Sequence, residues 1–360
     1  MRNFGAQKSK NGWMGVCAVA LASSILHPAP FSVWASHQGV NAPGGHRVEA
    51  TLAAAQPSAV KPGHQGNGLF YMTNATTDDL VIVDPVTEQI IKTIRVGKRP
   101  LGVTLTKDGR YAVTANFDSS NISVVDLKSL KAIRTVPAGI GPDGVTMTPD
   151  GKFAYVANAG SNDLTVIRVK DWRVVKTLPV GKSPDNLVFT RDGKTAYLTN
   201  CDSNNVAVID TSRIEVVQYI TVGTVPEGIV LTPDESRAYV ANNVSDDVSV
   251  IDLAARTVLK TIKVGTAPAG VSLAPDGRHV YVANEQDNTI SVIDTTTDEV
   301  VKTLPTGGKF PVDILFTDDG RRAFISHRDS SDVTILDLEA EKVVKSLWVG
   351  DSIYEGVAQK

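Results

Sequence analysis

Residues 239–252 read YVANNVSDDVSVID, two short apolar runs on either side of a polar stretch. Within each run Val, Ile and Tyr alternate with small or polar residues, and this period of two is typical of β-strands. Six similar copies occur along the chain: YMTNATTDDLVIVD, VTANFDSSNISVVD, YVANAGSNDLTVIR, YLTNCDSNNVAVID, YVANEQDNTISVID and FISHRDSSDVTILD. The seven copies end at Asp84, Asp126, Arg168, Asp210, Asp252, Asp294 and Asp337, a step of 42 residues that is once 43. The chain therefore contains an internal repeat.

Each repeat contains four strand-like runs, which residues 227–264 display as EGIVLT, AYVAN, VSVID and VLKTIKV. Turns rich in Pro, Asp and Gly separate the runs, and no segment has a convincing helical period. Four antiparallel strands in every 40 to 50 residues or so are typical of a β-propeller blade. A single blade cannot bury both of its faces, so neighbouring blades must stack. The repeat predicts an all-β fold, a seven-bladed propeller of four-stranded antiparallel blades.

The two ends of the repeat region indicate how the ring closes. The region begins at LFYMTN, a second strand without a first strand before it, and the chain ends in YEGVAQK, which is similar to the first-strand segment PEGIVLT. We expect the C-terminal strand to complete the N-terminal blade and close the ring. Such closure removes exposed sheet edges. The predicted propeller domain spans residues 67–360.

The N-terminal region has a different composition. Residues 1–35 contain basic residues, then an apolar run from Trp13 to Leu26, then small residues, the order of a secretory signal peptide. A membrane span is less consistent with this run, because about 14 apolar residues are fewer than the roughly 20 that cross a bilayer. Residues 36–66 read as a flexible leader rich in Ala, Gly and Pro. We expect a periplasmic or secreted protein without a membrane span after cleavage.

The charge balance argues against a nucleic-acid partner. The formal net charge is −3, and removal of Arg2, Lys8 and Lys10 with the signal would change it to about −6. Binding to a phosphate backbone usually needs a basic surface. We therefore expect no nucleic acid among the partners of this protein.

The repeat motifs resemble those of the YVTN-repeat β-propeller proteins, which include exported bacterial members and surface-layer-type proteins. The resemblance lies in YMTN, YLTN, three copies of YVAN, the VID endings and connections such as VGTVPEG at 222–228. It covers residues from about 67 to 360 and implies the propeller fold. It implies little about activity, because the motif is architectural and members of the family have varied roles.

Residues that the blades share are interpreted as scaffold. An Asn ends the second strand of six blades, where its short amide can bond the backbone of the following loop. Repeated glycines stand just before the inner strands. These positions are Asn74, Asn116, Asn158, Asn200, Asn242 and Asn284, and Gly102, Gly144, Gly228 and Gly270.

A ring of carboxylates is predicted where the blades differ. The residues just before the inner strands are Leu101, Asp143, Asp185, Glu227, Ala269, Val312 and Glu355, and Asp313 replaces the usual Gly in blade seven. Carboxylates that share a confined space either raise their own pKa values or gather cations. A metal site formed by Asp143, Asp185, Glu227, Asp313, Glu355 and His327, for a divalent cation such as calcium, is one hypothesis. The alternative is that Lys98, Arg99, Lys182, Lys309 and Arg328 neutralise the acids in surface pairs.

Two further side chains carry chemistry on the same predicted face. His327 replaces the shared Asn in blade seven and is expected near Asp313 and Glu355, either as a ligand or base or as a hydrogen-bonding substitute. If the protein is an enzyme, His327 and Asp313 are the catalytic candidates. Cys201 in blade four either binds a soft metal or a partner, or is buried.

Three functions fit these features. The leading hypothesis is an exported, non-catalytic propeller whose loop face and acidic channel mouth bind a protein or small-molecule ligand. The second is a metal-assisted, lactonase-like hydrolase or lyase with its site at the channel mouth. The third is a periplasmic redox partner, because the repeat is also similar to the propeller subunits of methylamine dehydrogenase and the haem domain of nitrite reductase. No phosphate loop, nucleophile elbow or haem-attachment pair of cysteines is present in the sequence.

Overall fold

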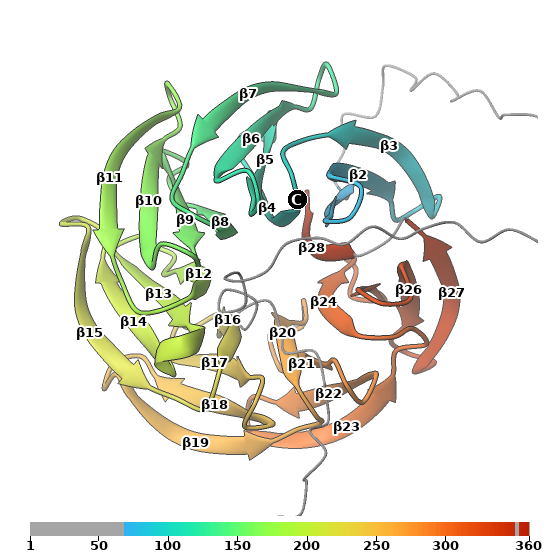
Figure 1. Ribbon diagram of the computed structural model, residues 1–360. Coiled ribbons are helices and arrows are strands. Elements are labelled where there is room, and N and C mark those ends of the chain that lie inside the picture. Colours follow the sequence, from blue (N-terminus) through green and yellow to red (C-terminus); the bar gives the residue numbers. More distant parts are fainter. Residues whose placement is uncertain (1–67, 350–352, 360) are drawn as a thin grey trace, which may run out of the picture.

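The computed structural model describes residues 68–349 and 353–359, which form seven four-stranded antiparallel sheets arranged in a ring (Figure 1). The prediction of a seven-bladed, all-β propeller is confirmed. The predicted signal peptide (1–35) and the predicted leader (36–66) lie outside the described residues. Within the described ranges the helical structure is a single 3-10 turn, Cys201–Ser203.

In six blades the strands follow one another from the centre of the ring outward in sequence order, and in the first blade the C-terminal strand lies innermost. The first blade consists of β28 (Ile353–Ala358), β1 (Phe70–Asn74), β2 (Asp79–Asp84) and β3 (Gln89–Arg95). The second and third consist of β4 (Pro100–Leu105), β5 (Tyr111–Asn116), β6 (Asn121–Asp126) and β7 (Lys131–Pro137), then β8 (Pro142–Met147), β9 (Phe153–Asn158), β10 (Asp163–Arg168) and β11 (Arg173–Pro179). The fourth and fifth consist of β12 (Pro184–Phe189), β13 (Thr195–Asn200), β14 (Asn205–Asp210) and β15 (Glu215–Thr221), then β16 (Pro226–Leu231), β17 (Arg237–Asn242), β18 (Asp247–Asp252) and β19 (Thr257–Lys263). The sixth and seventh consist of β20 (Pro268–Leu273), β21 (His279–Asn284), β22 (Thr289–Asp294) and β23 (Glu299–Pro305), then β24 (Pro311–Phe316), β25 (Arg322–His327), β26 (Asp332–Asp337) and β27 (Lys342–Trp348).

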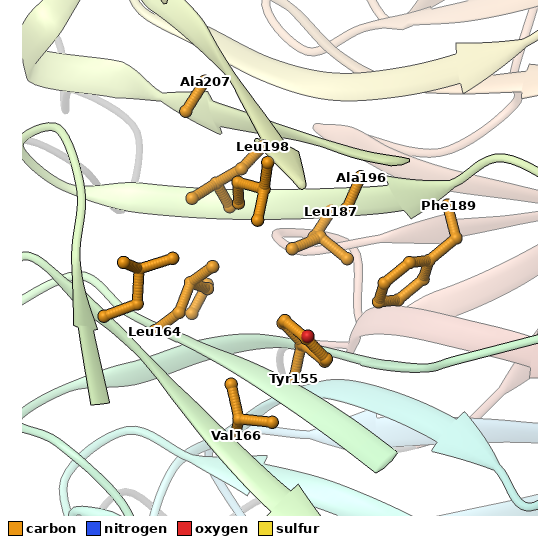
Figure 2. Packing of buried hydrophobic residues seen from close by; sticks show 11 residues of the cluster. Tyr155, Leu164, Val166, Leu187, Phe189, Ala196, Leu198 and Ala207 are labelled. Atoms are coloured by element: carbon orange, nitrogen blue, oxygen red, sulfur yellow. The ribbon is translucent and has the colours of Figure 1, made fainter. Parts of the chain in front are cut away.

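The hydrophobic core lies between blades. In the layer between blades three and four, Tyr155 and Leu164 of one blade pack with Leu187, Phe189 and Leu198 of the next (Figure 2). The rings of Tyr155 and Phe189 meet edge to face with their centroids 5.2 Å apart. Equivalent apolar layers join the other neighbouring blades. The alternating apolar residues of the repeat therefore stabilise the stacking of blades.

The shared Asn ties the second and third strands of a blade together. In blade five, Asn242 Nδ2 donates to Asp247 Oδ1 and to Ser249 Oγ, both at 2.9 Å. The prediction of a structural role is confirmed, but the expected backbone bonds occur in blade one, where Asn74 Oδ1 accepts from the amides of Thr76 and Thr77. In the other blades with this Asn, the amide donates to the side chain five residues later and, except in blade four, also to the side chain seven residues later.

Glycine lets the inner strands approach one another around the channel. A Cβ atom on Gly144 would lie 2.3 Å from the carbonyl oxygen of Asp185, and one on Gly270 would lie 2.2 Å from that of Val312. No side chain fits at such distances without movement of the neighbouring backbone. Blades four and seven carry Asn186 and Asp313 at this place, and both side chains line the channel mouth.

The C-terminal strand closes the ring as predicted. Strand β28 pairs antiparallel with β1 and lies innermost in the first blade (Figure 1). In addition to the strand pairing, Gly68 N donates to the Gln359 carbonyl oxygen at 2.8 Å, and Tyr71 Oη donates to Gln359 Oε1 at 3.0 Å. At the outer side of the first blade, Glu88 accepts from Arg322 and Lys345 of blade seven, at 2.5 and 2.7 Å. Backbone pairing thus joins the two ends of the repeat region within the first blade, and ion pairs join that blade to the seventh.

None of the helical structure in the described residues is long and apolar enough to cross a membrane.

Candidate functional site

A cavity of about 110 Å³ opens where the inner strands begin, at the mouth of the central channel. Six carboxyl groups line it in the described part of the chain: Asp143, Asp185, Glu227, Glu285, Asp313 and Glu355. Five of them belong to the carboxylate ring expected from the sequence. One guanidinium, that of Arg328, shares the wall. The site is therefore a strongly acidic cavity.

The inner strands place these acids by a shared local irregularity. Pairing between the first and second strand is interrupted just after the leading Pro, for example between Pro184 and Leu187 and between Pro226 and Ile229. Proline cannot donate to the ladder, and an irregularity of this kind re-aims the side chains that follow it. In this way β12 and β16 turn Asp185 and Glu227 into the channel.

Burial dominates the electrostatics of Asp143 and Asp185. Asp143 is 8% exposed, and burial together with the adjacent Asp185 charge raises its pKa well above its usual range, although Arg99 opposes this shift. Burial raises the pKa of Asp185 to about 6. Asp185 is only partly buried and lines the cavity, where the surrounding protein limits its hydration, so desolvation prevails. The two carboxyls therefore resist being charged at the same time.

Glu227 continues the same pattern in the next blade. Burial raises its pKa well above its usual range, and the charges of Glu285 and Asp185 raise it further. Arg328 acts in the opposite direction. Asp143, Asp185 and Glu227 stand on β8, β12 and β16 of three successive blades, and we call these three residues the acidic arc.

Asp313 and Glu355 lie beside each other on β24 and β28 and receive hydrogen bonds. Asp313 accepts from the amides of Gly356 at 2.9 Å and Ile314 at 2.8 Å, and burial raises its pKa to about 6. Asn186 Nδ2 donates to Glu355 Oε1 at 3.3 Å from the opposite side of the ring. Burial, followed by the Asp313 charge, raises the pKa of Glu355 well above its usual range.

Glu285, Arg328 and Tyr354 form the opposite wall. Arg328 and Glu285 form an ion pair with a nitrogen to oxygen distance of 3.2 Å, and their side chains are 14% and 5% exposed. The guanidinium lies 5.3 Å from the ring centroid of Phe310 and 5.8 Å from that of Tyr354. A buried cation is thus held by one carboxylate and two aromatic rings.

Sequence reasoning missed Glu285 and Tyr354. Glu285 follows the shared Asn284, in the position that Arg328 occupies after His327 in blade seven. Tyr354 stands where the inner strands of the other six blades begin with Pro. Both departures from the repeat are visible in the sequence, so a comparison of the blades at these two positions could have found them.

His327 does not line the cavity with Asp313 and Glu355, although its strand β25 pairs with β24, which carries Asp313. Its side chain is fully buried and does not line the cavity. Nδ1 lies 3.3 Å from Asp332 Oδ1, five residues later, and the ring packs against Gly308 as Asn116 packs against Gly97. His327 therefore takes the structural place of the shared Asn. Cys201 is also fully buried, with its sulfur 3.1 Å from the Pro226 carbonyl oxygen and 3.8 Å from Asp185 Oδ2.

The neutralising pairs of the alternative hypothesis do not form with the carboxylates that the sequence predicted. In residues 68–349 and 353–359, no ion pair within 4.0 Å joins a cation to the acidic arc, Asp313 or Glu355. Arg99 lies 3.6 Å from Asp118 instead, and Arg328 pairs with Glu285. Asp143 Oδ2 is buried without a hydrogen-bond partner. The described residues also contain no group of three or more His, Cys, Asp or Glu side chains that converge closely enough to hold a metal ion.

Comparison with known proteins identifies the fold. A family model described as YNCE-like beta-propeller matches residues 48–359. This match supports the propeller family, while the finer YVTN-repeat label stays an expectation. No curated protein matches the sequence.

Several solved structures share the fold at low sequence identity. Hydrazine synthase from Kuenenia stuttgartiensis is 22% identical over 76% of this chain and 92% of that one, with a TM-score of 0.69. A putative 6-phosphogluconolactonase from Bacteroides fragilis NCTC 9343 is 17% identical over 83% of this chain and 100% of that one, with a TM-score of 0.70. The dihydro-heme d1 dehydrogenase NirN in complex with DHE is 19% identical over 85% of this chain and 78% of that one, with a TM-score of 0.64. Identities this low show the fold alone.

Proposed function

This chain belongs to the YNCE-like β-propeller family, and we propose that it is a binding protein whose acidic channel mouth holds a positively charged ligand. The observation that carries the proposal is Asp143, which is 8% exposed and whose Oδ2 has no hydrogen-bond partner. It faces a cavity whose wall contains six carboxyls and one guanidinium among the described residues.

The energetics support a cationic ligand. Burial of a carboxylate without a partner costs several kcal/mol, so such a group either stays protonated or acquires a counter-charge. The pKa values of the acidic arc are raised, which reflects this cost. A cation in the cavity would replace like-charge repulsion by attraction and would offset part of the desolvation. The ligand-free arc is thus poised to gain by binding a cation.

The same charge disfavours an anionic ligand. A phosphorylated substrate would meet six carboxyls, and Arg328 is already paired with Glu285. Like charges in a confined site repel strongly. The resemblance in fold to a putative 6-phosphogluconolactonase therefore does not extend to a phosphate site at this cavity.

A thermal-shift series with purified protein tests the binding proposal. Small organic and inorganic cations are expected to raise the unfolding temperature, while a sugar phosphate leaves it unchanged. Asp143→Asn should abolish the stabilisation by cations, whereas Glu299→Gln, which changes an exposed carboxyl on β23, should retain it. Equal stabilisation of the wild type and the Asp143→Asn variant, or stabilisation by the sugar phosphate alone, would contradict the proposal.

A hydrolase is the second candidate, favoured by the coupling of Asp143 with Asp185. When two neighbouring carboxyls have raised pKa values, one remains protonated while the other ionises, which is an arrangement suited to general acid and base catalysis. A neutral lactone or ester would avoid the repulsion described above. Turnover of such a substrate that is lost in both Asp143→Asn and Asp185→Asn would support this function. Equal turnover in those variants and the wild type would exclude it at this cavity.

We also propose that the protein is exported, on the basis of the order of basic, apolar and small residues in 1–35. Fractionation of cells that express the full chain is expected to place a shortened protein outside the cytoplasm. Full-length protein in the cytoplasm would argue against export.

A further inference from the structure

We propose that the ligand of the channel mouth is an organic compound with two amino groups on an aliphatic chain, rather than a divalent metal ion. This inference rests on the proposed binding of a cation at the same cavity. It adds the chemical class of the ligand, which follows from how the acids and the apolar residues alternate around the ring.

The carboxyls are too dispersed to chelate a metal ion. Each member of the acidic arc comes from a different inner strand, and in the described residues no three potential ligands converge on one point. Calcium takes six to eight oxygen ligands at about 2.3 to 2.6 Å, and magnesium requires a nearly ideal octahedron at about 2.0 to 2.1 Å. An ammonium group needs less, because one or two acceptors at roughly 2.7 to 2.9 Å satisfy it.

The unpartnered oxygen lies within the arc. Asp143 Oδ2 is buried and has no hydrogen-bond partner, and no ion pair compensates the neighbouring Asp185 or Glu227 in the described structure. Glu285 differs, because Arg328 already occupies the place of its counter-charge at 3.2 Å. The arc therefore offers a first binding position for a nitrogen cation.

A second anionic position lies elsewhere on the ring. Asp313 on β24 and Glu355 on β28 adjoin at the closure of the propeller, and neither has a cationic partner within the described ranges. Their hydrogen bonds come from neutral donors, the amides of Gly356 and Ile314 and the side chain of Asn186. These bonds stabilise the ionised carboxyls and leave their charge uncompensated.

In the order of the blades, apolar residues stand between the two anionic positions. Ala269, Val271 and Val312 lie between Glu227 and Asp313, in a sector that also holds the already paired Glu285 and Arg328. On the other side, Leu101 lies between Glu355 and Asp143. All of these line the same cavity. A ligand with a cation at each end and methylene groups between them matches this alternation of acidic and apolar wall. A metal ion has no apolar part that could pack against these apolar residues.

The cavity wall already holds one nitrogen cation of the protein itself. The guanidinium of Arg328 is held by Glu285 and by the rings of Phe310 and Tyr354, without any group of converging carboxylates. Aromatic faces attract organic cations, and this attraction increases where water is excluded.

Isothermal titration calorimetry of the full chain with putrescine, n-butylamine and calcium chloride tests the inference. Putrescine is expected to bind with one-to-one stoichiometry and at least about 10-fold more tightly than n-butylamine, because the second ammonium adds a charge-assisted contact. Glu227→Gln and Asp143→Asn should each weaken putrescine binding by about 10-fold or more. Glu299→Gln, the matched exposed control, should bind like the wild type, and thermal unfolding of each variant establishes that it is folded.

The outcomes separate this inference from the proposal on which it rests. Tight binding of calcium that depends on Asp143, without binding of putrescine, would overturn the ligand class and leave a cation-binding function in place. Equal affinity for putrescine and n-butylamine would overturn the requirement for two amino groups. Tighter binding of a dilysine peptide than of putrescine would overturn a free diamine in favour of protein side chains. Absence of binding by all of these cations would overturn the proposed function itself.

Discussion

Two walls of the same cavity treat a buried carboxyl in opposite ways. On one wall Glu285, with a 5% exposed side chain, pairs with Arg328, and aromatic rings cover the cation. On the other wall Asp143, which is 8% exposed, has an oxygen without a partner and Asp185 as its charged neighbour. The first arrangement is complete within the fold. The second is not, and this incompleteness distinguishes a binding position from a structural ion pair.

The largest effect is expected from removal of the internal cation. Arg328→Met leaves Glu285 buried without its counter-charge and should lower the free energy of unfolding by about 3 kcal/mol. Equilibrium denaturation in urea measures this change. Arg321→Met, at an exposed arginine without an ion pair in the described structure, is the matched control and should change stability little. A loss no greater than that of the control would show that the Glu285 wall is not held by this pair.

The same chemical change on the two walls should alter the free energy of unfolding in opposite directions. Glu285→Gln deprives Arg328 of its partner and should destabilise the protein by about 2 kcal/mol. Asp143→Asn removes a carboxyl that burial disfavours and should stabilise the ligand-free protein by about 1 kcal/mol at pH 8. Parallel urea denaturation of both variants measures the difference. If both substitutions destabilise the protein equally, the two walls do not differ as described.

The pH dependence of stability should expose the uncompensated acids. Asp185 and Asp313 have pKa values raised to about 6, so the folded state binds more protons than the unfolded state between about pH 4 and 6. Stability therefore falls as the pH rises through this window, by about 1 kcal/mol for each group once screening by channel water is allowed for. Asp185→Asn should flatten the fall. A rise of stability across the same window would contradict the raised pKa values.

Ligand affinity should increase as the pH rises, whereas stability decreases. The groups that face a cation in the cavity are the six carboxyls, Tyr354 and Arg328, with Arg99 close to Asp143. Because the carboxyls must ionise to attract a cation, affinity should increase by about 10-fold between pH 5 and pH 8. Calorimetry in buffers of different ionisation enthalpy should also detect protons released on binding. Affinity that is independent of pH would indicate that these carboxyls do not contact the ligand.

The smallest effect is expected at His327. His327→Asn restores the residue of the other blades at a buried place away from the cavity, so ligand affinity should remain within about twofold of the wild type. Stability should change by less than about 1.5 kcal/mol, because Asn can reach Asp332 as Asn242 reaches Asp247. A loss of affinity of 10-fold or more, measured with the same cation as above, would return His327 to the site.

The architecture follows from the repeat. A period of two within strands and of 42 residues between blades specifies four-stranded sheets that must stack, and an incomplete blade at each end of the repeat specifies closure. Because each inner strand enters the channel at the same place in its blade, the sequence also predicted that Asp143, Asp185, Glu227, Asp313 and Glu355 share one cavity. Residues at equivalent positions of the repeat therefore lie at equivalent places around the ring.

Which of these charges are compensated depends on how the blades pack together. The sequence places Arg99 and Arg328 equally near the acids, but Arg99 lies by Asp118 and Arg328 selects Glu285. His327 carries chemistry that suits a site, yet it fills the buried place of an Asn. Ion pairing depends on distances of a few ångströms between side chains from different blades, and burial depends on which neighbours exclude water. Neither quantity can be derived from a single repeat. The missing hydrogen-bond partner of Asp143 Oδ2 is therefore evident only in the complete ring.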